Sequence, residues 1–113
     1  MRVFALKSCD TCRKALRALT DAGIAAQVVD VRADGIEAVD LAAIARHLGE
    51  RSVNRASTTW RGLDEAARAL PVADLLAAHP TVMKRPVIRD GDTWHVGWSA
   101  DVRAAVLPGA SET

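Results

Sequence analysis

Two cysteines, Cys9 and Cys12, stand near the start of the chain and are its only cysteines. An apolar run at 3–6 precedes them. After them apolar residues recur at spacings of three and four up to Gly23, a pattern typical of a helix. We therefore expect the pair at a strand-to-helix junction, with Cys9 at the helix start. Free backbone amides and the positive end of the helix dipole favour a thiolate there, and the thiolate is the reactive form of cysteine.

The neighbours of the pair refine this expectation. Asp10 opposes ionisation of Cys9, whereas three cations favour it: Lys7, Arg13 and Lys14. Cys12 follows about one helical turn later on the same face, so that it can reach back toward Cys9. We predict that Cys9 is the nucleophile and that Cys12 is a resolving thiol, which would close a short disulfide.

Other interpretations of the same stretch remain open. The hydroxyls of Ser8 and Thr11 could donate hydrogen bonds to the thiolate or could serve as helix caps. The cysteines could also be two small buried hydrophobic residues, or half of a zinc site. Because a zinc site needs two further ligands and the three histidines are scattered singly, we predict no metal.

Composition limits the classes of protein that the chain can represent. Its 113 residues carry a net charge of +1, and half of them are hydrophobic. This size predicts a single domain, placed at residues 1–107, with a flexible C-terminal tail at 108–113. The absence of a long basic run argues against nucleic-acid binding, and no apolar stretch has membrane-spanning length. With two cysteines and no secretory leader, we expect a cytoplasmic protein, which we take to be a monomer.

Hydrophobic periodicity predicts a strand–helix–strand opening, a helical middle part and a strand–turn–strand–helix ending. The expected strands are 2–6, 25–31, 82–89 and 93–97, and the expected helices are 10–22, 36–48, 62–70, 72–78 and 100–107. The Asp-Gly pair at 90–91 indicates a hairpin turn. This order predicts an α/β, thioredoxin-like (glutaredoxin-like) fold. It has a mixed four-stranded sheet, helices on both faces and a helical insertion, about 36–80, after the second strand.

The segment 50–61 has no clear period and is rich in hydroxyls, and we expect a polar loop there. It is either solvated or able to bind an oxyanion or carboxylate through its arginines. In a thioredoxin-like fold the hairpin brings a proline opposite the reactive cysteine, and Pro86 takes this position. We predict a cis Arg85–Pro86 peptide bond, which would expose the preceding backbone to a bound thiol peptide. The cis form of such a bond costs only about 0.5–1 kcal/mol.

Three motifs together carry a resemblance to a known family: residues 9–15 (CDTCRKA), 54–61 (NRASTTWR), and 84–87 (KRPV) with 96–99 (VGWS). Over about residues 1–107 the chain resembles the ArsC-type, arsenate-reductase-related family. Within it the chain is similar to the YffB-like subgroup of glutathione-dependent thiol reductases. The Spx transcription regulators share this fold. The resemblance implies a thioredoxin-like sheet with a helical insertion, a catalytic cysteine at Cys9 and the family's Arg-Pro pair at Arg85 and Pro86.

The resemblance also implies the ligands. It points to glutathione as co-substrate with no tightly bound cofactor, to glutathione or glutaredoxin as partner, and to a small oxidised thiol or an oxyanion as substrate. The expected catalytic residues are Cys9, Cys12 and Arg85. The expected ligand-binding residues are Ser8, Thr11, Arg55, Trp60, Arg61, Lys84 and Pro86.

The chain departs from the arsenate reductases of this family in its arginines. Arg55 is offset by one position from one oxyanion-binding arginine, and Gly97-Trp98-Ser99 stands where another is found. A charged hydrogen bond contributes about 1.5–3 kcal/mol, so the loss of one weakens oxyanion binding about tenfold or more. We therefore predict a glutathione-dependent thiol reductase whose arginines bind the glutathione carboxylates. The alternatives are an arsenate reductase coupled to glutathione and glutaredoxin, and an Spx-like redox-switched regulator that binds RNA polymerase.

Overall fold

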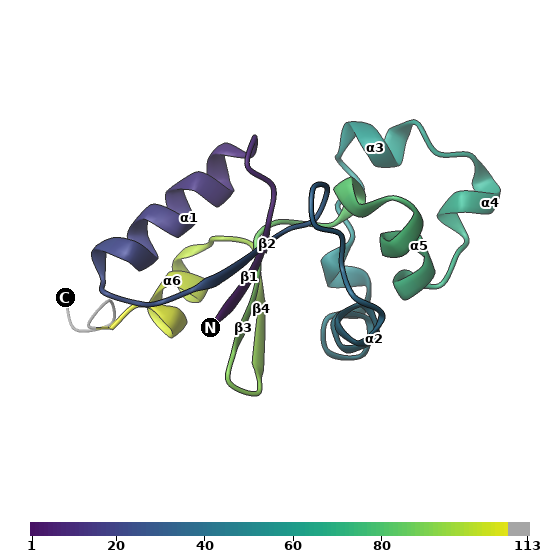
Figure 1. Ribbon diagram of the computed structural model, residues 1–113. Helices are drawn as coiled ribbons and strands as arrows, with labels where there is room; N and C mark the ends of the chain where they lie inside the picture. The colour runs from purple at the N-terminus through teal and green to yellow at the C-terminus, as the bar shows by residue number, and fades with distance from the viewer. Residues whose placement is uncertain (109–113) are drawn as a thin grey trace.

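The structure, a computed structural model that describes residues 1–108, is built on one four-stranded sheet (Figure 1). The strands are β1 (Arg2–Ala5), β2 (Gln27–Asp30), β3 (Val87–Asp90) and β4 (Thr93–Val96). They lie in the order β2-β1-β3-β4, in which β1 runs parallel to β2 and antiparallel to β3, and β3 runs antiparallel to β4. The predicted mixed α/β sheet is confirmed.

Alternation along the central strand β1 creates a core on each face of the sheet. Val3 and Ala5 point to one face, where they pack with Cys12 and Leu19 of α1 (Asp10–Asp21) and with Val106 of α6 (Ala100–Val106). Phe4 and Leu6 belong to the second core, which includes buried residues of α2 (Ala38–His47) and α5 (Val72–Ala78). The end of β1 and the start of α1 therefore lie between the two cores, and Cys9 packs against both.

A block of short helices lies between β2 and β3, as predicted for the insertion. Its members are α2 (Ala38–His47), η1 (Gly49–Ser52), α3 (Thr58–Arg61), α4 (Glu65–Arg68), α5 (Val72–Ala78) and η2 (Pro80–Val82), where η denotes a 3-10 turn. Figure 1 shows this block on one side of the sheet and α1 with α6 on the other side. The expectation of helices on both faces is confirmed.

Several expected boundaries are wrong for local reasons. The segment 50–61 is not a plain loop, since η1 and α3 lie within it. The Ser57 hydroxyl caps α3 by accepting a hydrogen bond from the Trp60 amide at 3.1 Å. Val82 and Met83 were expected in a strand, but Val82 belongs to η2, and Met83 forms an isolated bridge with Val53. β3 therefore begins only at Val87, directly after the proline.

The hairpin turn is present and consists of two residues, because Asp90 pairs with Thr93 across it. Gly91 has a φ of +61°, a conformation that glycine adopts without strain, and it stands first in the turn. The Arg85–Pro86 peptide bond is cis, as predicted. The expected flexible tail falls on Pro108, which is described, and on 109–113, which lie outside the described residues. Among the described residues, no helix has the length and apolar character needed to span a membrane.

Candidate active site

Cys9 is the N-cap residue of α1, the position predicted for the nucleophile. Its carbonyl accepts a hydrogen bond from the Arg13 amide at 3.0 Å and its own amide donates to the Leu6 carbonyl at 2.9 Å. Its backbone is extended, with φ −89° and ψ 120°, and no polar side chain caps the helix. The sulfur therefore stands where a capping oxygen would otherwise accept hydrogen bonds from the first helical turn.

Opposing effects set the pKa of the Cys9 thiol, and their balance lowers it below the ordinary value. Partial burial, the largest single effect, would raise it. Favourable interactions of the sulfur with the backbone and thiol of Cys12 and with the charged side chain of Arg85 together outweigh that burial. Because Cys9 remains partly exposed, the thiolate is open to a substrate.

Cys12 has the opposite properties. Its side chain is completely buried in the core beneath α1, and that burial raises the pKa of the Cys12 thiol to about 11. The negative charge on Cys9 adds to this rise, while the backbone of Leu6 and the charge of Arg85 act against it. Cys12 therefore stays protonated at neutral pH, and its thiol is among the groups that lower the pKa of Cys9.

Arg85 is the cation that acts on Cys9, and backbone groups orient it. Its Nη1 donates to the carbonyls of Thr81 at 2.8 Å and of Met83 at 3.1 Å. Its Nε is buried and, among the described residues, has no hydrogen-bond partner. A guanidinium group held in this way has further N–H donors, which suit a thiolate or a ligand anion.

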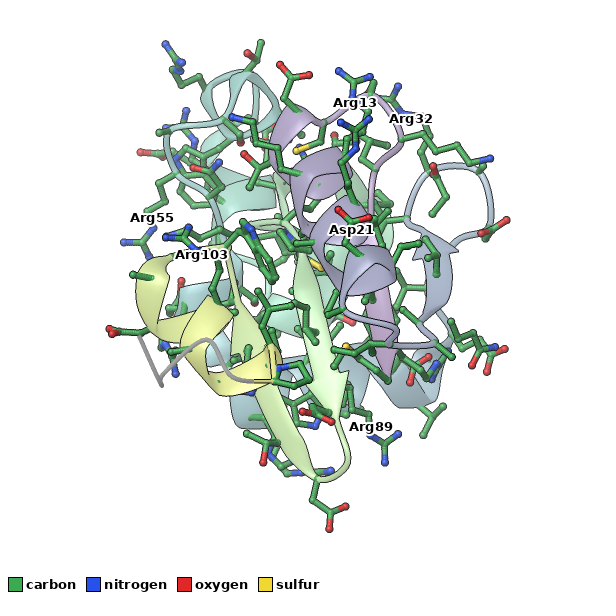
Figure 2. The ribbon with its side chains drawn as sticks, turned by 90° about the vertical axis from the view of Figure 1, so that its left-hand side faces the viewer. Arg13, Asp21, Arg32, Arg55, Arg89 and Arg103 are labelled. Atoms are coloured by element: carbon green, nitrogen blue, oxygen red, sulfur yellow. The ribbon has the colours of Figure 1, made fainter. Side chains whose placement is uncertain are left out.

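The cations expected from the local sequence do not have this role. Lys7, Arg13 and Lys14 are exposed, and none of them is a main cause of the lowered pKa of Cys9, which comes from Arg85 and Cys12. Arg13 instead forms an ion pair with Asp10 on the outer face of α1. Figure 2 shows Arg13 at the end of the helix that carries the cysteines.

Ser8 and Thr11 are exposed, and neither hydroxyl takes part in a side-chain hydrogen bond within residues 1–108. Of the two alternatives, helix capping is not seen, since Cys9 is the N-cap residue and has no side-chain capping hydrogen bond. Because Ser8 and Thr11 lie close to Cys9 in the chain, we keep the prediction that they bind a ligand.

Asp30 supports the site in a way that the sequence analysis missed. It is buried at the end of β2, where Oδ1 accepts hydrogen bonds from the Ala33 and Arg32 amides at 2.8 and 2.9 Å. Its Oδ2 accepts from the Lys7 amide at 3.2 Å, which ties down the turn that leads to Cys9. The Ala33 amide first, then those of Lys7 and Arg32, hold the pKa of this carboxyl below its usual range despite burial.

We expect Asp30→Asn to lower the free energy of unfolding at pH 7 by about 2 kcal/mol, because its amide NH₂ would face backbone donors. Because the pKa of Asp30 is lower in the folded than in the unfolded state, the ionised carboxylate stabilises the fold. This contribution is complete at pH values above the pKa of the unfolded state. That contribution is lost as pH falls through the folded value, so the difference from wild type shrinks below about pH 4. Urea unfolding from pH 7 to pH 3.5 measures it. Asp21→Asn, at the exposed end of α1 (Figure 2), is the control, and equal effects of the two variants would contradict this role.

Two arginines lie against the ring of Trp60 in the block of short helices. The guanidinium carbons of Arg55 and Arg68 lie 5.5 and 5.4 Å from its ring centre, and Arg68 also donates to the Trp60 carbonyl. Arg55 pairs with Glu50 at 2.9 Å at the surface, and Arg61 donates to the Ala56 carbonyl at 2.9 Å. Arg68 was not predicted, because it lies in a different short helix from Trp60.

The two remaining predicted residues lie next to Arg85. The Lys84 side chain is exposed, while its amide donates to the Ser52 carbonyl at 2.7 Å. Pro86 is buried, and its carbonyl accepts from the Gly97 amide at 2.8 Å. The segment around Arg85 is thus fixed on both sides by backbone hydrogen bonds.

A pocket of about 440 Å³ lies away from the cysteines, between α2 and the β3–β4 hairpin. Asp40 lines this pocket and pairs with Arg2 at 2.8 Å, at the start of β1, whereas Cys9 follows the end of that strand.

Among residues 1–108, no group of three His, Cys, Asp or Glu side chains is placed to hold a metal ion.

Three features define the class of this protein: a thioredoxin-like sheet, a partly exposed cysteine at the first helix start, and an arginine next to a cis-proline. The class is that of thiol-dependent reductases of the arsenate-reductase type. The chain belongs to the ArsC family, whose family model matches residues 4–106. The resemblance stated from the sequence motifs is confirmed.

The chain is also similar to individual proteins over most of its length. The chain is similar to the structure of the YffB protein (PA3664), with 36% identity, a TM-score of 0.84, and coverage of 94% of this chain and 97% of that one. It is similar to an arsenate reductase (ArsC) related protein from Brucella melitensis, with 31% identity, a TM-score of 0.69 and 91% of both chains covered. An uncharacterized protein of Haemophilus influenzae is 39% identical over 95 residues, which are 79% of this chain and 83% of the relative.

Proposed function

We propose that the protein is a glutathione-dependent thiol reductase that uses Cys9 as its nucleophile. The observation that carries the proposal is the partly exposed Cys9 sulfur, whose pKa is lowered by Cys12 and Arg85. The thiolate is the form of cysteine that attacks disulfides, and a lowered pKa combined with access is the usual mark of a redox cysteine.

In the first step the Cys9 thiolate attacks the glutathione sulfur of a glutathione mixed disulfide. A Cys9–glutathione disulfide forms, and the released thiol leaves as a thiolate that takes up a proton. In the second step a glutathione thiolate attacks the glutathione sulfur of this intermediate. Oxidised glutathione leaves, and the Cys9 thiolate returns with its two hydrogen-bonding partners in place.

Cys12 has a supporting role in this scheme. With a pKa of about 11, only about one Cys12 thiol in ten thousand is ionised at pH 7, which makes it a poor attacking group. Removal of the Cys9 charge in the mixed disulfide lowers this pKa only in part, since burial is the larger cause. We therefore favour resolution by glutathione and assign Cys12 chiefly as a hydrogen-bond donor to Cys9.

The carboxylates of glutathione are proposed to bind beside Trp60, as the sequence suggested for Arg55 and Arg61. Arg55 pairs with Glu50 only at the surface, where both side chains are about two-thirds exposed. Such a pair contributes little, so a ligand carboxylate can replace Glu50 at small cost. Arg85 adds positive charge beside Cys9, and we propose that the exposed Lys84, which precedes it, also serves the ligand.

We place the reaction in the cytoplasm, where glutathione keeps thiols reduced. The described cycle takes its catalytic groups from a single chain, and we propose that the protein works as a monomer. Glutaredoxin is the alternative electron donor in place of the second glutathione.

Two Cys12 variants separate its possible roles. We expect Cys12→Ser to keep at least about half of the turnover with glutathione, because the serine hydroxyl still donates to Cys9. Cys12→Ala should raise the pKa of Cys9 by roughly half a unit to one unit. Steady-state turnover and pH-dependent alkylation measure the two effects. Complete loss of turnover in Cys12→Ser would instead assign Cys12 as the resolving thiol.

The function itself is tested in an assay that couples NADPH and glutathione reductase to the formation of oxidised glutathione. The substrate is the mixed disulfide of glutathione and 2-mercaptoethanol, and a parallel arm contains arsenate. Turnover of the mixed disulfide supports the proposal. Turnover in the arsenate arm alone would assign an arsenate reductase, and turnover in neither arm would overturn the proposal.

A further inference from the structure

The Arg85 guanidinium depends on a short piece of backbone for its placement. Its Nη1 is held by the carbonyls of Thr81 and Met83, which lie within and directly after η2. A shift of this turn moves both acceptors and therefore moves the guanidinium. Because the attraction between the Arg85 guanidinium and the Cys9 thiolate depends on their separation, such a movement weakens the stabilisation of the thiolate.

A single 3-10 turn such as η2 has little stability of its own. On one side, backbone hydrogen bonds secure it, from the Asn54 amide to the Val82 carbonyl at 2.8 Å and from the Lys84 amide to the Ser52 carbonyl at 2.7 Å. On the side that faces α3, a hydrogen bond between side chains connects η2 to its neighbour. The hydroxyls of Thr59 and Thr81 share a hydrogen bond of 2.7 Å, and both residues are half-buried.

We propose that Thr59 and Thr81 are positioning residues, whose shared hydrogen bond fixes the Thr81 carbonyl and thereby holds the Arg85 guanidinium beside Cys9. Thr59 belongs to α3, next to Trp60, so the bond also links the proposed carboxylate-binding surface to the thiolate. The role of the pair in turnover rests on the proposed function, whereas its effect on Arg85 does not.

The geometry explains why hydroxyl-bearing residues are needed at both positions. Valine has nearly the same shape as threonine but can neither donate nor accept this bond, and a single valine would leave the opposite half-buried hydroxyl without its partner. Serine retains the hydroxyl and loses only the methyl group. The two substitutions therefore separate the hydrogen bond from simple packing.

The test compares Thr59→Val, Thr81→Val, the double valine variant and the two serine variants with wild type. We expect each valine variant to lower kcat/KM about threefold to tenfold and to raise the pKa of Cys9 by about half a unit. The serine variants should stay close to wild type in both readouts. The double variant should be no worse than the poorer single variant, because both singles break the same bond.

Thr58→Val is the matched control, an exposed threonine in the same helix that takes no part in the bond, and it should behave as wild type. The proposal is overturned if the valine variants keep the wild-type pKa of Cys9, if serine is as damaging as valine, or if the two valine effects add. A shifted pKa of Cys9 in a protein that turns over no mixed disulfide would uphold the positioning role and reject the proposed function.

Discussion

Replacing Cys9 by serine is expected to abolish turnover of a glutathione mixed disulfide, with a loss of at least about a thousandfold. A serine hydroxyl does not ionise near neutral pH, so the hydrogen bonds that stabilise the thiolate have no anion to act on. Initial rates in the NADPH-coupled assay measure the loss, and mass spectrometry detects whether a Cys9–glutathione adduct forms in wild type.

The control for this prediction is Ala22→Ser, a similar change at the exposed end of α1, which should leave the rate unchanged. Wild-type turnover in Cys9→Ser would contradict the account directly, because the attacking thiol would then have to be Cys12. The burial of Cys12 and its pKa of about 11 argue against that outcome.

Arg85→Ala is expected to lower kcat/KM about 10- to 100-fold and to raise the pKa of Cys9. The variant removes both the positive charge and the hydrogen bond that act on the sulfur. Arg85→Lys should recover only part of the loss. An ammonium keeps the charge, but it cannot reproduce the planar fork that binds the Thr81 and Met83 carbonyls while it serves the thiolate.

A matched control is available on the following strand. Arg89 in β3 is also an arginine, but it lies at the hairpin end of the sheet (Figure 2), with its guanidinium 5.7 Å from the ring centre of Trp94. Arg89→Ala should keep the wild-type pKa of Cys9 and the wild-type kcat/KM. If Arg85→Ala behaves in the same way as Arg89→Ala, the electrostatic account of the site is wrong.

The local part of this site could be predicted from the sequence. The apolar run, the cysteine pair and the helical period that follows them place Cys9 at a helix start, and this depends only on neighbouring residues. The strand order and the cis Arg85–Pro86 bond also agreed with expectation, because the order of elements leaves few topologies and the family resemblance aligned the proline.

The long-range part could not be predicted from local patterns. Local patterns pointed to the cations near Cys9 in the chain, whereas Arg85, which only the family resemblance supplied, acts on Cys9 from the segment before β3. Asp30 looked like the end of a strand, and only the pairing of β2 with β1 shows that its carboxylate reaches the Lys7 amide. Arg68 of α4 reaches the ring and the carbonyl of Trp60 in α3, and no periodicity in residues 58–68 indicates this contact.

The short helix α3 is an intermediate case. The sequence Ser57-Thr58-Thr59-Trp60 contains a good N-cap residue, so the start of a helix could have been recognised there. With only four residues, α3 shows no apolar period, and the hydroxyl-rich composition favoured a loop. The stability of α3 comes from tertiary contacts, among them the bond from Thr59 to Thr81.

The most direct test of the account is the rate of Cys9 alkylation as a function of pH, followed residue by residue by mass spectrometry. We expect the midpoint for Cys9 to lie below the ordinary pKa of a cysteine thiol, and Cys12 to resist alkylation until strongly alkaline pH, near its value of about 11. A Cys9 midpoint at or above the ordinary value would contradict the central claim, because no stabilised thiolate would then be available for reduction.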